Sequence, residues 1–225
     1  MRGLTIGRRA QTGIAEAWDA VRRALPAALL CTVLGTAGVL GSRALAHAYG
    51  MDNAYAVRDP AAITDALWFV GIQSTVGGLL WFCGAAVCLF GGTLLRRAPD
   101  ARREAGFLLA SGLFSLWLGL DDVFMFHDEL LPLAGIPEAV PYALYLVLGA
   151  LYVPRFWRVI LRTKCLLLVG AGVGLGTSLI IDQFFDSHFF EDGTKFYGIV
   201  FWAAYLWDAA ATLLIEAFAP DRATR

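Results

Sequence analysis

The stretch that decides the fold class extends from residue 165 to 186 and reads CLLLVGAGVGLGTSLIIDQFFD. It contains no charged residue before Asp182, and as a helix its apolar part would cover about 25 Å at ~1.5 Å per residue. That length approaches the ~30 Å hydrocarbon core of a bilayer, in which each segment must satisfy its own backbone polar groups. The stretch therefore predicts a transmembrane helix that ends in carboxylates.

Five further apolar stretches of comparable length lie on either side of this one. Hydrophobic residues make up 58% of the chain and charged residues 16%, against about 45–50% and about 25% in soluble domains. We expect an all-α integral membrane protein, a six-transmembrane helix bundle over residues 25–218 with a tail at 219–225. The six predicted spans are 25–47, 66–95, 105–126, 139–161, 165–186 and 194–217.

Residues 1–24 are expected to form an amphipathic segment and not a cleavable signal peptide. They contain five arginines and no apolar core of adequate length before Pro26. A helix over residues 12–25 would place four apolar side chains on one face: Ile14, Trp18, Val21 and Leu25. Such a helix is expected to lie on the membrane surface. A helical connector without lipid contact is the alternative.

The charged residues are segregated between the two sides of the predicted membrane domain. Fifteen of the eighteen Lys and Arg residues fall on one side, whereas all three histidines and twelve of the nineteen carboxylates fall on the other. Short loops rich in Lys and Arg remain in the cytoplasm, so we expect both termini to be cytoplasmic. Sixteen Arg against two Lys favour a GC-rich bacterial genome. The expected location is therefore the bacterial inner membrane, with an extracytoplasmic active face.

Acidic and histidine residues gather at the outer ends of the third and fifth predicted spans. The chain reads DDVFMFHDE over residues 121–129 and DQFFDSHFFED over residues 182–192. Asp122 follows Glu104, and Asp182 follows Lys164, by the same 18 residues, or roughly 27 Å of helix. The two carboxylates are therefore expected at matching depth. Ionised carboxylates at that depth cost several kcal/mol each unless they are paired, hydrated or bound to a cation.

A bound divalent cation would relieve this repulsion most directly. Lys195 is a single positive charge and is expected to pair with Glu191, four residues earlier. Mixed His and carboxylate ligands suit Zn, Mn or Fe, whereas Asp oxygens alone suit Ca²⁺. The expected metal ligands are Asp122, His127, Asp182, Asp186 and His188. The expected catalytic or supporting residues are Asp121, Asp122, Asp128 and Glu191.

An ordinary structural origin of the cluster stays open. Acidic residues are common at outer helix ends, because the positive-inside rule empties those ends of Lys and Arg. The spacings HExxH, HxxxH and ExxH of known metal sites are absent from the chain. The neighbouring phenylalanines fit an interfacial aromatic belt, or alternatively the wall of a pocket for an acyl chain.

These observations favour a metal-dependent integral-membrane hydrolase of a lipid or other apolar substrate, in which the metal lowers the pKa of a bound water. The first alternative is a cation- or proton-coupled transporter or channel that uses the outer acidic vestibule. Asp208, roughly 22 Å into the last span, would then be an ion relay; otherwise it reaches polar partners at the cytoplasmic end. The second alternative is a non-catalytic accessory membrane subunit.

Glycines recur within the span at 165–186. The pairs Gly170/Gly174 and Gly172/Gly176 have the small-xxx-small spacing that lets another helix approach closely, and they also allow oligomerisation through this span. No strand precedes them, so a nucleotide-binding loop is not expected. Nucleic acid binding is not expected either, because the basic residues form juxtamembrane clusters without a groove or stacking platform.

Overall fold

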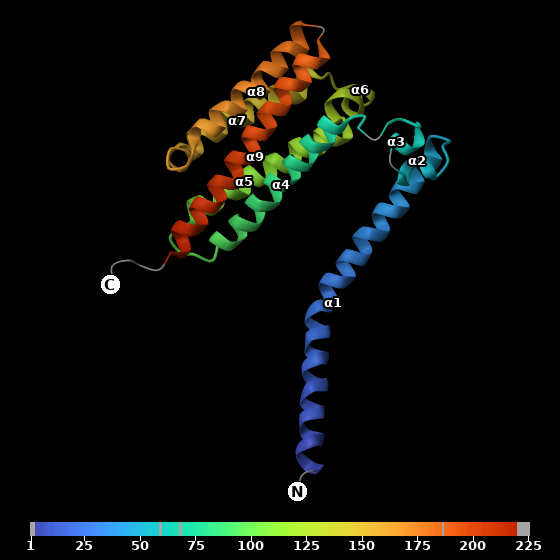
Figure 1. Ribbon diagram of the computed structural model, residues 1–225, viewed down its shortest axis with the longest axis vertical. Coiled ribbons are helices and arrows are strands. Elements are labelled where there is room, and N and C mark those ends of the chain that lie inside the picture. The colour runs from blue at the N-terminus through green and yellow to red at the C-terminus, as the bar shows by residue number, and fades with distance from the viewer. Residues whose placement is uncertain (1–2, 59, 68, 186, 220–225) are drawn as a thin grey trace. The chain divides into compact units, whose positions relative to one another are not determined.

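The computed structural model describes residues 3–219 apart from residues 59, 68 and 186, and every regular element in that part of the chain is a helix (Figure 1). Six of these helices are long and apolar enough to cross a membrane. The chain divides into two compact units, Met1–Val70 and Gly71–Arg225. The prediction of an all-helical chain with six helices of membrane-crossing length and composition is confirmed.

The first unit consists of one long helix, α1 (Gly3–Ala48), and two single-turn helices, α2 (Ala54–Val57) and α3 (Pro60–Ile63). α1 continues through Pro26, because a proline can bend a helix without ending it. The predicted helix over residues 12–25 is thus joined to the first candidate span, Ala24–Ala48, without a break. Its position on the membrane surface stays a prediction.

The second unit contains the other five candidate spans: α4 (Ile72–Leu95), α5 (Arg102–Phe124), α7 (Ala139–Ile160), α8 (Cys165–Phe184) and α9 (His188–Phe218). Between α5 and α7 the chain forms a short π-helix, η1 (Phe126–Leu130), and a single turn, α6 (Leu131–Leu133). α4 packs along α5 and α9, and α8 packs along α9. α7 has a much thinner contact with α5 (Figure 1).

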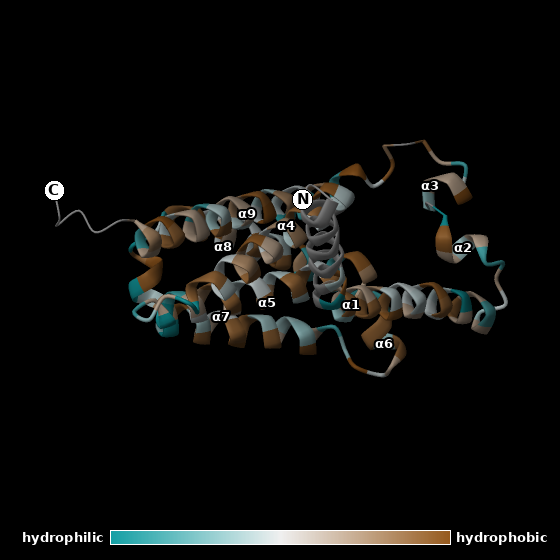
Figure 2. Ribbon diagram, turned by 90° about the horizontal axis from the view of Figure 1, so that it is seen from below, coloured by the Kyte–Doolittle hydropathy of each residue, from teal (hydrophilic) through white to brown (hydrophobic). Residues whose placement is uncertain are grey.

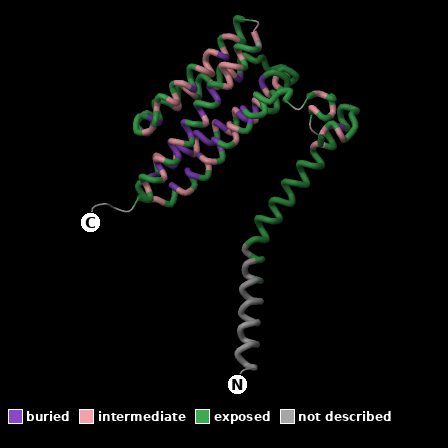
Figure 3. Tube along the Cα trace, in the orientation of Figure 1, coloured by how far each residue is buried: buried purple, intermediate pink, exposed green. Residues whose placement is uncertain are grey.

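The buried core of this unit is concentrated on α4, α5 and α9 (Figure 3). Cys88, Phe107 and Tyr205 are fully buried there. On the outer faces of α7 and α8, large apolar side chains such as Leu151 and Leu166 are 65% and 79% exposed. Figure 2 shows hydrophilic residues gathered near the turn that joins α7 to α8. An apolar surface of this kind is unusual on a soluble protein and suits contact with acyl chains.

Glycines bring the backbones of α8 and α9 together. A Cβ atom added to Gly174 would lie 2.6 Å from the Cα of Gly198, and one added to Gly170 would lie 2.7 Å from the Phe201 ring. The predicted close contact through Gly170 and Gly174 is therefore confirmed. Gly172 and Gly176, by contrast, have no described neighbour within 4 Å of such a Cβ.

Two helix starts differ from the predicted spans by six residues, and the other boundaries differ by three or fewer. The second membrane-crossing helix begins at Ile72 and not at residue 66, because turns occupy the preceding residues and Gly71 has a left-handed φ of +71°. The last one begins at His188 and not at residue 194, because Gly193 continues the helix and does not interrupt it. Apolar composition alone does not reveal either difference.

Replacing Gly198 by alanine is expected to destabilise the contact between α8 and α9. The added methyl group would lie 2.6 Å from the backbone nitrogen of Leu175, and overpacking of this kind costs about 1–3 kcal/mol. The melting temperature in detergent should therefore fall by roughly 3–10 °C. Gly172→Ala and Gly176→Ala are matched controls that should shift it by less than about 2 °C. Equal shifts in all three variants would contradict this account of the contact.

Candidate functional site

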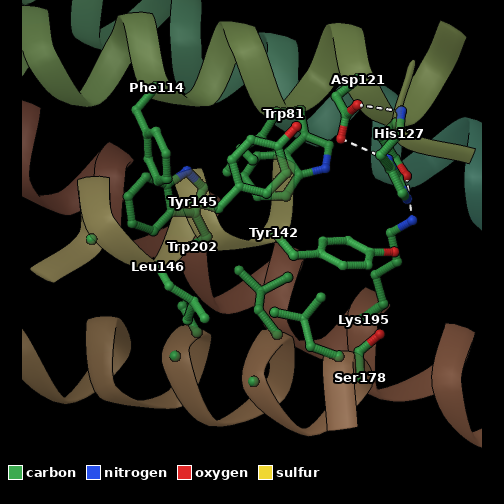
Figure 4. Close-up of a pocket in the computed structure, with 18 of the residues that line it drawn as sticks. Trp81, Phe114, Asp121, His127, Tyr142, Tyr145, Leu146, Ser178, Lys195 and Trp202 are labelled. Atoms are coloured by element: carbon green, nitrogen blue, oxygen red, sulfur yellow. Dashed lines mark hydrogen bonds and ion pairs between the residues drawn. The ribbon is translucent and has the colours of Figure 1, made fainter. Parts of the chain in front are cut away.

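A cavity of about 460 Å³ lies between α5, α7, α8 and α9, with Trp81 of α4 in its wall (Figure 4). Along α8 its lining extends from Asp182 to Leu168, which is about 21 Å of helix. One end of the cavity is polar: Asp121, Asp122, His127, Tyr142, Ser178, Asp182, Glu191 and Lys195. Most of the remaining lining is apolar, including Phe114, Leu118, Leu146, Val153, Leu168, Leu175 and Leu179. The cavity is thus long, with a polar end and an apolar remainder, and this lining suits an amphiphile.

His127 is positioned by an irregular turn that follows α5. Met125 ends α5 with a left-handed φ of +50°, and η1 follows it directly. The backbone N–H of His127 donates a hydrogen bond to Asp121 Oδ1 at 3.0 Å, and its ring Nδ1 lies 2.8 Å from Asp121 Oδ2. A positive φ is uncommon outside glycine and persists where surrounding contacts fix it. The two bonds to Asp121 are such contacts.

His127 lies between two carboxylates. Its Nε2 is 3.1 Å from Asp128 Oδ1, on the opposite side of the ring from Asp121. Burial by itself lowers the pKa of His127, but the hydrogen bonds and charges of Asp121 and Asp128 outweigh burial and raise the pKa to about 9. The hydrogen bond from His127 in turn lowers the pKa of Asp128. At neutral pH the site therefore holds an imidazolium whose two N–H groups both donate to carboxylates.

Lys195 of α9 forms the second charged pair of the polar end. Its Nζ lies 2.5 Å from Asp122 Oδ1 on α5, and Figure 4 labels Lys195 at the same end of the cavity as His127. The expected pairing of Lys195 with Glu191 stays a prediction, but the structure gives Lys195 a partner on another helix, Asp122, that the sequence did not predict. The physical reason is the packing of α9 across the end of α5, which one sequence does not reveal. The pair also borders a second cavity of about 230 Å³.

Asp182 accepts hydrogen bonds from neutral groups. The Tyr142 hydroxyl of α7 donates to Asp182 Oδ2 at 3.3 Å, and Gln183 Nε2 donates to the same oxygen at 3.0 Å. The Tyr142 ring also lies 5.3 Å, centroid to centroid, from the His127 ring. Tyr142 therefore connects α7 both to the Asp121–His127 pair and to α8.

The expected metal ligands are only partly brought together. Asp122, His127 and Asp182 line the same cavity, but each already contacts a different protein group. The side chains of Asp186 and His188 lie outside the described residues. Within the described part of the chain, no three His, Cys, Asp or Glu side chains are grouped so that they could hold a metal ion. The metal stays a prediction.

The expected catalytic residues lie at the polar end. Asp121, Asp122 and Glu191 line the cavity, and Asp128 contacts His127.

Sequence reasoning missed five aromatic residues of the same cavity: Trp81, Phe114, Tyr142, Tyr145 and Trp202. The Trp81 Nε1–H and the Tyr145 hydroxyl are buried in the wall without a hydrogen-bond partner among the described residues. The i,i+3 spacing of Tyr142 and Tyr145 was an available signal, because it places both rings on one helix face. An aromatic belt has the same signature.

Asp208 lies near the opposite end of the second unit and lines neither cavity. Its Oδ1 is 2.7 Å from the Nζ of Lys164, in the turn between α7 and α8. In the same turn, Arg162 contacts both Glu104 of α5 and Glu216 of α9. Asp208 is therefore one of several carboxylates that pair with the basic α7–α8 turn.

Residues 24–209 match the family described as "Domain of unknown function (DUF8692)". Because the match covers most of the chain, the protein belongs to this family. No match was found among curated proteins or among solved structures. The chemistry of the cavity must therefore come from the geometry of its own residues.

The His127 pKa predicts how stability depends on pH. Because the folded pKa of about 9 exceeds the unfolded value near ~6.5, the stabilisation is complete below about pH 6.5 and is lost as the pH rises through 9. Its size is on the order of 3 kcal/mol. The melting temperature in detergent should therefore fall by about 5–10 °C between pH 6.5 and 9.5. His127→Gln should remove most of that fall, and His47→Gln should retain it. A fall of equal size in the His127 variant would contradict the assignment.

Proposed function

We propose that this protein is an integral-membrane hydrolase that binds a single-chain amphiphile in the cavity between α5, α7, α8 and α9. The observation that carries the proposal is the two-part lining of the cavity, with the buried Asp121–His127 pair at one end and apolar side chains beyond it. Pockets of roughly 300–1,000 Å³ with a few placed polar groups are typical ligand sites. A length of about 21 Å covers roughly two thirds of the hydrocarbon core, which suits one acyl chain.

Hydrolysis of an ester or amide needs an acid and a base at the reacting carbonyl. His127 suits the acid, because it is protonated at neutral pH and Asp121 fixes its ring. Its Nε2–H would reach the leaving atom once the exposed Asp128 side chain gives up its contact with that nitrogen. Glu191, at the same end of the cavity, is the candidate base. Water bonds to the carbonyl carbon as Glu191 takes one water proton. The bond to the leaving oxygen or nitrogen then breaks as His127 protonates that atom, and solvent carries the proton from Glu191 back to His127.

A metal-dependent form of this hydrolase makes a further demand on the site. A divalent cation would have to displace Lys195 from Asp122, and Asp121 or Asp128 from His127. With their present partners, Asp122 and His127 do not fit a metal ion, so the proposed mechanism uses no metal. Zn, Mn, Fe and Ca therefore enter only as outcomes of the test.

The other two functions have less support. The transporter alternative uses Asp208 as an ion relay, but the contact of Asp208 with Lys164 supplies an ordinary partner for that carboxylate. No contact in the described part of the chain favours an accessory subunit over an enzyme. The bacterial inner membrane, the extracytoplasmic active face and oligomerisation through residues 165–186 stay predictions.

The decisive measurement is palmitate release by the purified protein in nanodiscs, from palmitoyl esters and amides with neutral, cationic or anionic head groups. The wild type should turn over at least one substrate of this panel. His127→Gln should lower kcat by about 10²-fold or more, because the acid is lost. Asp208→Asn, which removes a carboxylate far from the cavity, should retain wild-type turnover. No release from any substrate would contradict the proposal, and equal losses in both variants would point to misfolding.

Metal removal separates the two forms of the hydrolase. The proposed mechanism predicts that turnover survives dialysis against a chelator and that the purified protein contains no stoichiometric Zn, Mn, Fe or Ca. Elemental analysis before and after dialysis makes this measurement. A stoichiometric metal whose removal stops turnover, and whose return restores it, would replace the metal-free mechanism by the metal-dependent one.

A further inference from the structure

The polar end of the cavity carries an excess of negative charge. Four carboxylates line it against two cationic side chains, His127 and Lys195. Asp121 contacts His127, and Asp122 contacts Lys195, so these four side chains balance in pairs. Asp182 lies outside both pairs.

Asp182 is the carboxylate whose surroundings define the inference. Its hydrogen-bond donors, Tyr142 and Gln183, are both neutral, and no ion pair involves Asp182 within the described part of the chain. A carboxylate at the end of a membrane helix is costly unless a cation or water compensates its charge. A positively charged ligand group would supply that compensation from within the cavity.

Ser178 gives an independent indication at the same place. It lies one helical turn before Asp182 on α8, so the two side chains share a face. Ser178 is only 6% exposed and lines the cavity. Its hydroxyl makes no hydrogen bond to any other described residue, and Figure 4 labels Ser178 in the wall of the cavity. The hydroxyl oxygen is not among the fully buried polar atoms without a partner in the described chain, so it is accessible from the cavity and can bond to a ligand atom there.

We propose that the ligand of this cavity carries a primary ammonium group, held by the Asp182 carboxylate and the Ser178 hydroxyl, on a single long apolar chain. The inference rests on the proposed function and names the class of amphiphile that the cavity selects. An ammonium group donates charge-assisted hydrogen bonds to both oxygens, and the Tyr142 ring beside Asp182 attracts a cation further. The charge of the Asp182 carboxylate disfavours a phosphate or carboxylate head group at this position.

Three ligands with the same chain test this: hexadecylammonium, hexadecyltrimethylammonium and hexadecanol, measured by native mass spectrometry from detergent micelles. The wild type should bind hexadecylammonium at least about tenfold more tightly than hexadecanol. Asp182→Asn should weaken both cations about tenfold and leave hexadecanol unchanged. Ratios of wild-type to variant affinity cancel the partitioning of each ligand into the micelle. Glu138→Gln is the matched control, because Glu138 lies at the same end of α7 as Tyr142 but does not line the cavity. It should change each affinity by less than about twofold.

Ser178→Ala provides a second variant that changes one small side chain. It should weaken hexadecylammonium about threefold and leave hexadecyltrimethylammonium unchanged, because the quaternary head has no N–H to donate to the hydroxyl. Equal binding of hexadecylammonium and hexadecanol, or an equal effect of Glu138→Gln and Asp182→Asn, would overturn the ammonium site. The proposal that the cavity binds an amphiphile would not be affected by that result. Failure of all three ligands to bind the wild type would overturn the cavity's proposed function as well.

Discussion

The paired hydrogen bonds between Asp121 and His127 are the constraint on which the polar end of the cavity depends. One carboxylate accepts from both the backbone N–H and the ring of the same histidine, so it fixes the chain and the side chain together. This anchoring offsets the left-handed backbone at Met125 and sets the direction in which η1 leaves α5. Strained backbone at a functional site is stable only where its surroundings determine it in this way.

The cavity exists because the helices of the second unit pack unevenly. Glycines allow near contact of α8 with α9, and α4 packs along both α5 and α9. α7 lacks such an extensive contact, and the lining from Gly149 to Val153 lies across an open space from α8. A close-packed interior leaves few voids larger than a water molecule. A cavity of about 460 Å³ is therefore a property of the helix arrangement and not a packing defect.

The sequence predicted what depends on composition along one helix. Span number, span length and the gathering of acidic and histidine residues at two helix ends all follow from local pattern, as do the close-contact positions Gly170 and Gly174. It could not predict what depends on a second helix. Lys195 has one carboxylate four residues earlier, Glu191, and another on α5, Asp122. The rotation of α9 about its axis decides that Lys195 reaches Asp122.

The same limit explains the other differences. The turn at Met125 has no glycine or proline to mark it, so a π-helix that brings His127 back to Asp121 has no local signature. Gly172 repeats the spacing of Gly170, yet it faces open space because each α-helix presents only one face to its neighbour. A metal was predicted from the need to neutralise carboxylates, and the observed partners of Asp121 and Asp122 meet that need with protein cations.

The two ends of α7 are held by interactions of different kinds. At the Arg162 end, ion pairs join the α7–α8 turn to α5 and α9. At the other end, the bond from Tyr142 to Asp182 is a single neutral-donor contact of 3.3 Å. A ligand cation at Asp182 would compete with Tyr142 for the same carboxylate oxygens. Binding of such a ligand would therefore be coupled through Asp182 to the position of the first turns of α7, since a ligand shifts an equilibrium only by interacting differently with its two states.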